Sequence, residues 1–186
     1  MTGRATFTRM QDGTAADYAI IEPLERAYNA NLADRVLGAV ADLAGGLDGY
    51  PVDRTTHSLQ SATRALRGGE DTDYVVAALV HDIGDPLAPF SHGSLAAAVL
   101  RPFVSERLCW IVAHHPVFQM YHYAPHMGGV RDARERYRDH PWFDDAVYFC
   151  EHYDDNCFDP DYPTLPLEHF APLAREVFSR EPRYPD

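Results

Sequence analysis

An almost unbroken apolar run ends in a histidine and an aspartate, and it constrains the fold more than any other feature of this 186-residue chain. Residues 74–83 carry apolar side chains on nearly every side of a helix, which predicts a helix buried at the centre of the protein. His81 and Asp82 lie near the end of the run, and Gly84 follows as a residue that readily ends a helix. A buried imidazole and carboxylate are costly unless they are paired or bind a metal. The run therefore predicts a central helix with a polar pair at its carboxyl end.

Apolar residues recur at helical spacing along most of the remaining chain, and no stretch shows the alternation that is typical of a β-strand. We expect Thr55 or Thr56, Asp71 or Thr72, Ser91 and Ser105 to begin helices, and Pro116 to end or bend one. The predicted fold is all-α, a single helical bundle. It spans residues 15–180, after a flexible segment 1–14 and before a tail 181–186. The expected helices lie at 15–44 (one interrupted helix or two), 55–67, 74–83, 91–100, 105–115, 131–138, 143–155 and 167–179.

Composition narrows the function. The formal net charge of -12 and the absence of a basic cluster argue against nucleic acid and anionic membranes as partners. All 16 basic residues are arginine, so lysine Schiff-base chemistry is excluded. The three cysteines lack a paired metal-binding spacing, and we find no signal peptide and no apolar run of roughly 20 residues. We therefore expect a cytoplasmic protein that acts on a small molecule; the oligomeric state stays open.

Imidazole and carboxylate side chains recur near the predicted helix ends and on apolar faces, and divalent transition metals favour such ligands. Six of them exceed what one zinc ion needs, which indicates two metals. Taken singly each has an ordinary explanation, such as an exposed polar residue or a charge at a helix end, and Asp155 competes with Asp154. Adjacent residues on a helix diverge by about 100°, so only one of His114 and His115 should bind the same ion. The candidate ligands are His57, His81, Asp82, His92, His114 and Asp154.

The order of these residues resembles a known superfamily. The segments that carry the likeness are His57-Ser58-Leu59-Gln60, His81-Asp82-Ile83-Gly84, Ser91-His92-Gly93, Ile111-Val112-Ala113-His114-His115 and Cys150-Glu151-His152-Tyr153-Asp154. Their H…HD…D order resembles the HD-domain superfamily. The additional histidines between HD and the last aspartate resemble its mixed-valent diiron oxygenase branch, which includes myo-inositol oxygenase and the phosphonate-degrading HD-domain oxygenases.

The resemblance implies an HD-domain bundle with two irons, Fe(II) and Fe(III), in its core and dioxygen as co-substrate. One iron would be held by His57, His81, Asp82 and Asp154, and the other by His92 and His114, with Asp82 bridging. His114 is chosen over His115 because it follows a short apolar stretch like that of the family and because His115 directly precedes Pro116. The implied reaction is oxidative cleavage of a C–C or C–P bond in a small substrate that carries a hydroxyl or amino group.

Further residues near these motifs are candidates for the reaction and for substrate binding. Asp82, Asp85 and Gln60 are the catalytic candidates, and Glu151, one turn before Asp154, could orient a ligand. Phe118, Gln119, Tyr121 and Tyr50 are the substrate-binding candidates. The resembled phosphonate enzymes carry a histidine and a lysine where this chain has Asp85 and Phe118. These replacements remove positive charge, which puts a phosphonate in doubt and favours a cationic or amine-bearing substrate.

Two other functions remain open. The first is an HD-type metal-dependent phosphohydrolase acting on a phosphoester or nucleotide, in which Arg64, Arg67 or Arg101 would bind the phosphate. The second is a non-catalytic, metal-stabilised binding domain. The ligand number and the absence of lysine argue against the hydrolase, and the binding domain predicts bound metal without turnover.

Overall fold

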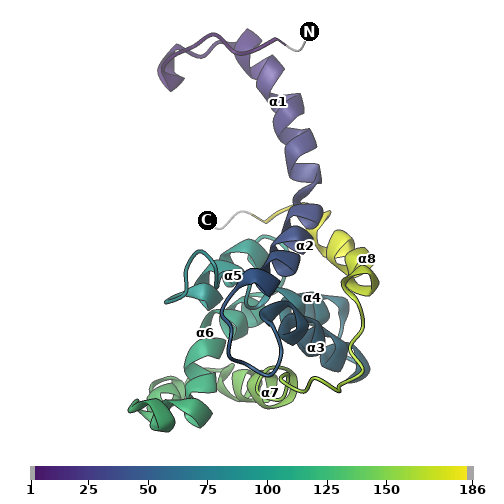
Figure 1. Cartoon of the computed structure of the whole chain (residues 1–186). Helices are drawn as coiled ribbons and strands as arrows, with labels where there is room; N and C mark the ends of the chain where they lie inside the picture. Colours follow the sequence, from purple (N-terminus) through teal and green to yellow (C-terminus); the bar gives the residue numbers. More distant parts are fainter. Residues whose placement is uncertain (1–2, 184–186) are drawn as a thin grey trace.

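The computed structural model describes residues 3–183, which form helices and connecting loops without a β-strand among them (Figure 1). The predicted all-α fold is confirmed. The helices are α1 (Ala15–Ala30), α2 (Leu32–Asp42), α3 (Arg54–Arg67), α4 (Thr72–Val80), α5 (His92–Leu100), α6 (Glu106–Tyr123), α7 (Phe143–Tyr153) and α8 (Leu167–Phe178). Short 3-10 helices lie at Met10–Asp12, Leu43–Gly45, Ala124–Met127 and Arg131–Tyr137.

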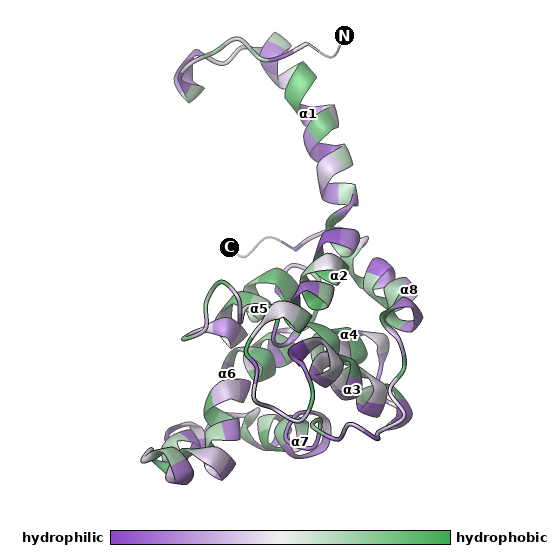
Figure 2. Cartoon of the chain, viewed as in Figure 1, coloured by the Kyte–Doolittle hydropathy of each residue, from purple (hydrophilic) through white to green (hydrophobic). Residues whose placement is uncertain are grey.

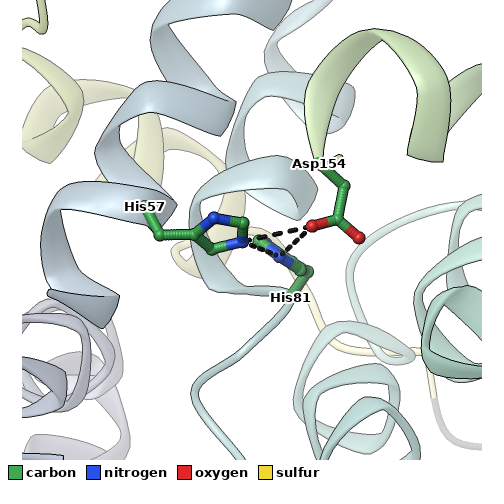
Figure 3. Close-up of side chains that lie close together, drawn as sticks. All are labelled: His57, His81 and Asp154. Carbon is green, nitrogen blue, oxygen red and sulfur yellow. Dashed lines mark hydrogen bonds and ion pairs between the residues drawn. The ribbon is translucent and has the colours of Figure 1, made fainter. Parts of the chain in front are cut away.

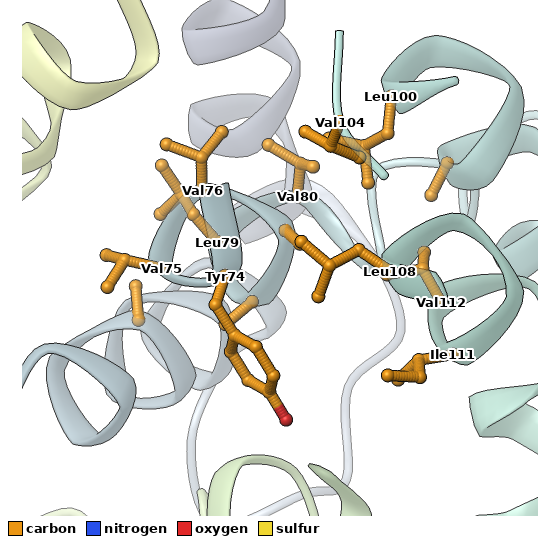
Figure 4. Close-up of a cluster of buried hydrophobic side chains, with 14 of the residues drawn as sticks. Tyr74, Val75, Val76, Leu79, Val80, Leu100, Val104, Leu108, Ile111 and Val112 are labelled. Atoms are coloured by element: carbon orange, nitrogen blue, oxygen red, sulfur yellow. The ribbon is translucent and has the colours of Figure 1, made fainter. Parts of the chain in front are cut away.

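Helix α4 is the centre of the bundle, as its sequence predicts. Every residue from Tyr74 to Val80 is buried, and α4 contacts α2, α3, α6 and α8. Figure 4 shows Val80 on the side of the helix that faces Leu100 and Leu108, and Val75 and Val76 on the opposite side. Burying these side chains stabilises the fold by roughly 1.5–3 kcal/mol each. The apolar run therefore fixes the position of the two polar residues that follow it.

Aspartate and serine side chains cap the N-termini of three of the helices. Asp53 accepts a hydrogen bond from the Thr56 amide (2.7 Å), Asp71 from the Tyr74 amide (2.9 Å) and Ser105 from the Leu108 amide (3.3 Å). The prediction that Thr55 or Thr56 caps α3 was wrong, because Asp53 precedes both. The Thr55 hydroxyl instead donates to the Val40 carbonyl (2.8 Å) and so ties α3 to α2.

Helix α6 does not end at Pro116, which was one of the two outcomes expected there, but continues to Tyr123. A proline inside a helix leaves the carbonyl four residues earlier without its usual N–H donor. That carbonyl belongs to Val112, and the Nδ1 atom of His115 donates to it at 2.7 Å. The helix therefore continues because a side chain replaces the missing backbone donor.

Helix α1 extends away from the bundle, and residues 3–13 form a loop beside its first turns (Figure 1). Colouring by hydropathy shows that apolar residues concentrate in the bundle, whereas α1 alternates between apolar and polar residues (Figure 2). Within the described residues, no helix is both long enough and apolar enough to cross a bilayer. The bounds predicted for the domain, 15–180, stay a prediction.

Candidate metal centre

Three buried side chains from three helices meet at the carboxyl end of α4. His57 lies in the first turn of α3, His81 directly follows α4, and Asp154 directly follows α7. The two Nε2 atoms of the histidines are 3.1 Å apart, and Asp154 Oδ1 lies 3.1 Å from His57 Nε2 and 3.6 Å from His81 Nε2 (Figure 3). We call these three residues the first ligand group.

A second set of side chains lies on the other side of Asp82. His92 begins α5 and His115 lies in the middle of α6, and their Nε2 atoms are 3.2 Å apart. Asp82 Oδ1 lies 3.2 Å from His115 Nε2 and 3.4 Å from His92 Nε2. We call His92 and His115 the second ligand group.

Asp82 lies between the two groups and turns one oxygen toward each. Its Oδ1 atom faces the second group, whereas Oδ2 lies 3.6 Å from the Nε2 atoms of both His57 and His81. The carboxylate is almost completely buried. One residue therefore has an oxygen available for a cation in either group.

Hydrogen bonds to the outer nitrogen orient all four imidazoles. The Nδ1 atom of His57 lies 3.1 Å from the Cys157 carbonyl, and that of His81 lies 2.7 Å from the Ala78 carbonyl. His115 Nδ1 is bonded to Val112, as described above, and His92 Nδ1 is bonded to the Pro89 carbonyl (3.5 Å) and also lies 3.2 Å from Asp85 Oδ1. Because carbonyl and carboxylate oxygens only accept, each Nδ1 must carry the proton. In a neutral ring the lone pair is then on Nε2, the atom that faces the carboxylates of the cluster.

This arrangement fits divalent metal ions. Two lone pairs about 3 Å apart repel each other unless a proton or a metal ion lies between them. Nitrogen ligands at about 2.0–2.1 Å from one ion, at angles of about 90–110°, are about 2.8–3.4 Å apart, which agrees with both histidine pairs. In addition, Asp154 Oδ2 is buried without a hydrogen-bond partner. The buried cluster is therefore compatible with a metal site.

The charges of the cluster also favour a cation. Burial lowers the pKa of His81, but the nearby carboxylates of Asp82 and Asp154 outweigh this effect and raise the pKa to about 9. Burial alone would raise the pKa values of Asp82 and Asp154, yet the surrounding histidines hold both well below the usual range. Both carboxylates thus stay ionised in the protein interior, and a metal ion can replace the proton that His81 otherwise holds.

The structure corrects the choice between the two adjacent histidines. His115 is fully buried in the cluster, whereas His114 points elsewhere: its ring stacks on Trp110 (4.3 Å between centroids) and its Nδ1 bonds the Trp110 carbonyl (2.8 Å). The sequence prediction treats Pro116 as a reason against His115. In fact Pro116 leaves the Val112 carbonyl available for His115 Nδ1, so the proline supports the orientation of that ring.

A cavity of about 820 Å³ opens beside the cluster. Of the two ligand groups, His92 lines it, while Arg54 and Asp85 form the adjoining wall. Aromatic and acidic side chains form much of the rest. The lining residues are Leu43, Gly46, Leu47, Tyr50, Arg54, Asp85, Pro86, Pro89, His92, Pro116, Gln119, His122, Tyr123, Glu151, Asp155, Asn156 and Phe158.

The substrate-binding candidates divide into two pairs. Tyr50 and Gln119 line the cavity, and Gln119 Nε2 also donates to Asp154 Oδ1 at 2.5 Å. Phe118 is fully buried on the opposite side of α6, against Trp110 and Phe143, and so cannot contact a ligand in the cavity. Tyr121 packs under the guanidinium of Arg134 (3.8 Å) instead of lining the cavity. The predicted roles of Phe118 and Tyr121 were therefore wrong, because the helix rotates both away.

The catalytic candidates also differ in position. Asp85 lies beside the cluster, with one oxygen near His92. Gln60 lies farther away and exchanges two hydrogen bonds with Asp159: its Nε2 donates to the carbonyl (2.6 Å) and its Oε1 accepts from the amide (3.4 Å). Gln60 thus holds the loop that follows Asp154. A direct catalytic role for Gln60 does not agree with this position.

Two contacts of the cluster were not predicted. Arg54 Nη1 donates to Asp82 Oδ2 at 2.9 Å, and the Phe158 ring lies 4.6 Å from the His57 ring. The spacing of Arg54 and His57, three residues apart on α3, could have indicated the first contact, because such residues share a helix face. No local pattern indicates the second, which depends on the path of the loop after α7.

Comparison with known proteins agrees with this geometry. Residues 54–141 match the family model of the HD domain. The matched segment contains the histidine–aspartate pair at 81–82, His57 and the second ligand group, and ends before Asp154. No curated protein matches the chain significantly.

Proposed function

We propose, with the HD-domain match of residues 54–141 as the premise, that this protein is a dinuclear-iron oxygenase. It uses dioxygen to cleave a C–C or C–P bond in a small organic substrate that carries a hydroxyl or an amino group. The observation that carries the proposal is the position of Asp82, whose two oxygens face two separate pairs of histidines. A mononuclear site needs only one such pair, so the second pair supports a second ion.

The chain supplies six ligands in this proposal. His57, His81 and Asp154 would hold one iron and His92 and His115 the other, and Asp82 would serve both. When bound, a mixed-valent Fe(II)/Fe(III) pair supplies a redox-active site for dioxygen and a Lewis acid for the substrate hydroxyl or amine. The outer hydrogen bonds of the histidines keep the ligands in place, and Gln119 holds Asp154.

The cavity binds and orients the substrate. The three histidines at positions 57, 81 and 115 are fully buried, whereas the side chain of His92 is 15% exposed and faces the cavity. A substrate therefore approaches from the side of His92. The protein that surrounds the other ligands excludes bulk water from the first group.

The cavity wall favours an amine-bearing substrate over a polyanion. Tyr50, Tyr123 and Phe158 provide aromatic surfaces, on which organic cations bind well. Asp85, Glu151 and Asp155 add carboxyl groups to the same wall. Arg54, the one arginine among the described residues that line the cavity, is already paired with Asp82 and Asp85. A phosphonate dianion would find little uncompensated positive charge here.

A metal-dependent phosphohydrolase is the second candidate. It is supported by the HD-domain match itself and by the guanidinium of Arg54 at the cavity wall. In that case the residues of the cluster would position a water molecule for attack on a phosphoester. Arg64, Arg67 and Arg101 do not line the cavity, which weakens the prediction that they bind phosphate.

Dioxygen uptake distinguishes the two functions. Protein loaded with Fe(II) under argon would be mixed with oxygenated buffer and with amino alcohols, polyols or phosphonates, one class at a time. We expect substrate-dependent consumption of dioxygen with one of these classes, and none with the Asp82→Ala variant. Hydrolysis of phosphoesters by the Mn(II) or Mg(II) protein, without any dioxygen uptake by the iron form, would contradict the proposal and support the hydrolase.

A further inference from the structure

Arg54 connects the two ligand groups although it is not a candidate ligand. It is the first residue of α3, and its side chain extends toward the loop that follows α4. Its side chain is 15% exposed, at the cavity wall, with its guanidinium carbon 5.0 Å from the centre of the Tyr50 ring. The guanidinium forms ion pairs with two carboxylates: Asp82 at the centre of the cluster and Asp85 at the cavity wall.

The first contact fixes the carboxylate plane of Asp82. Arg54 Nη1 donates to Oδ2 at 2.9 Å, and Oδ2 is the oxygen that faces His57 and His81. A carboxylate that is held at one oxygen cannot rotate freely about its Cβ–Cγ bond. Because Oδ2 is held toward the first ligand group, Oδ1 is held toward His92 and His115.

The second contact reaches His92 through Asp85. Arg54 Nε lies 3.2 Å from Asp85 Oδ2, and the other oxygen of Asp85 lies 3.2 Å from His92 Nδ1. The same nitrogen is hydrogen-bonded to the Pro89 carbonyl, at 3.5 Å. Asp85 therefore helps to hold the orientation of the one histidine of the cluster that is not completely buried.

We infer that Arg54 is a positioning residue for the second ion of the centre, acting through Asp82 and through Asp85. The inference rests on the proposed two-metal centre but not on the reaction that the centre catalyses. It predicts that losing Arg54 weakens the binding of the second ion far more than that of the first. His57, His81 and Asp154 keep their own backbone and side-chain contacts in its absence.

Charge alone predicts the opposite result, which makes the inference testable. Removing a guanidinium leaves Asp82 and Asp85 without their counter-charge, and two unpaired carboxylates attract a cation more strongly. If Arg54 acts by positioning, its loss instead lets the Asp82 carboxylate and the His92 imidazole turn away from the second ion. The direction of the change in affinity therefore separates positioning from charge.

The experiment is a titration of the metal-free protein with Co(II) alone, followed by calorimetry and by the visible absorption of the bound ion. We expect two binding steps in the wild type. In the Arg54→Gln variant we expect the second step to weaken about 10- to 100-fold, the range that is typical when a group supporting a ligand is lost. The first step should change by less than about threefold, and the absorption of the second ion should change in shape.

Two further variants complete the design. Arg54→Lys keeps the charge but cannot contact both carboxylates through a planar fork, so its second step should be as weak as that of Arg54→Gln. Arg67→Gln is the matched control on α3, because Arg67 donates to the Pro163 carbonyl (2.7 Å), away from the cluster. It should bind both ions like the wild type. Circular dichroism of each metal-free variant checks that the fold is retained.

Several results would overturn the inference: tighter or unchanged second-ion binding in Arg54→Gln, full restoration by Arg54→Lys, or equal loss of both ions in the folded variant. Failure of the proposed two-metal centre would give a different result, because the wild type itself would then bind fewer than two Co(II) ions.

Discussion

The four clustered histidines share one hydrogen-bonding pattern: Nδ1 donates to an oxygen outside the cluster, and Nε2 faces the cluster. For His81 and His115 that oxygen is a carbonyl three residues earlier on the same helix. For His57 it comes from Cys157, about 100 residues away in the chain. The hydrogen-bond acceptors of His81 and His115 are therefore local in the sequence. The orientation of His57 depends instead on how the loop after α7 returns to α3.

Replacement of the two adjacent histidines tests whether His115, and not His114, is a metal ligand. His115→Ala should bind one metal ion per chain instead of two, because it removes half of the second ligand group. His114→Ala should still bind two, since His114 contacts Trp110 and not the cluster. Metal analysis of both purified proteins after loading with Fe(II) measures the difference. The correction fails if His114→Ala loses an ion and His115→Ala does not.

Among the elements, α5 and α6 determine the distance between His92 and His115. They pack closely because Gly93 has no side chain: a Cβ atom there would lie 2.6 Å from the Val112 carbonyl oxygen and 3.1 Å from the Pro116 ring. Val112 is also the residue whose carbonyl receives His115 Nδ1. The contact between these helices and the orientation of the ligand therefore depend on the same few atoms.

Gly93→Ala tests this packing. The added methyl group must push α5 from α6, and such overpacking typically costs about 1–3 kcal/mol, more than the gain in helix propensity of about 1 kcal/mol. We expect a lower free energy of unfolding and weaker binding of the second ion. Gly38→Ala on α2 is the control, because nothing lies within 4 Å of its Cβ position and the change should stabilise the protein by about 0.5–1 kcal/mol. Chemical denaturation measures both, and equal effects would contradict the account.

The start of α1 depends on Asp17. Its carboxylate accepts from the hydroxyl and amide of Thr14 (2.6 and 3.0 Å) and from the Thr6 amide (2.7 Å). These hydrogen bonds, led by that of the Thr14 hydroxyl, lower the pKa of Asp17 to about 2. Because the pKa is lower in the folded than in the unfolded state, the ionised form stabilises the folded segment above about pH 4.

We therefore expect the contact between residues 3–13 and α1 to weaken only as the pH falls from about 4 toward about 2. The carboxyl carbon of Asp17, followed by NMR during acid titration, should show a midpoint near the lower value. Asp17→Asn should remove this pH dependence of the Thr6 amide signal. A midpoint at the ordinary aspartate pKa, or an unchanged Thr6 signal throughout, would contradict the assignment.

For the whole molecule, the central apolar helix and the all-α class could be predicted because they follow from the local pattern of side chains. Five of the six predicted ligands, all except His114, lie in the cluster because His and Asp residues at helix ends are costly to bury without partners. The rest could not be predicted in this way. The side of α6 that faces Asp82 depends on the phase of a helix that continues past a proline, and the places of Phe118, Tyr121 and Gln60 follow from that phase and from loop paths.

The fold brings helices α3 to α7 together around one carboxylate, that of Asp82, which follows α4. Asp82 is the only described residue with an oxygen near both ligand groups. The central claim is therefore that this single carboxylate serves two ions. Every other feature of the proposed centre, including the role of Arg54, depends on it.

The most direct measurement is the iron content per chain of the wild-type protein and of Asp82→Ala, loaded with Fe(II) under argon and freed of excess metal. A shared carboxylate predicts two ions in the wild type and none retained by the folded variant, because the second ion keeps only His92 and His115 and the first ion loses one of its four protein ligands. One ion retained by Asp82→Ala, or only one in the wild type, would contradict the claim.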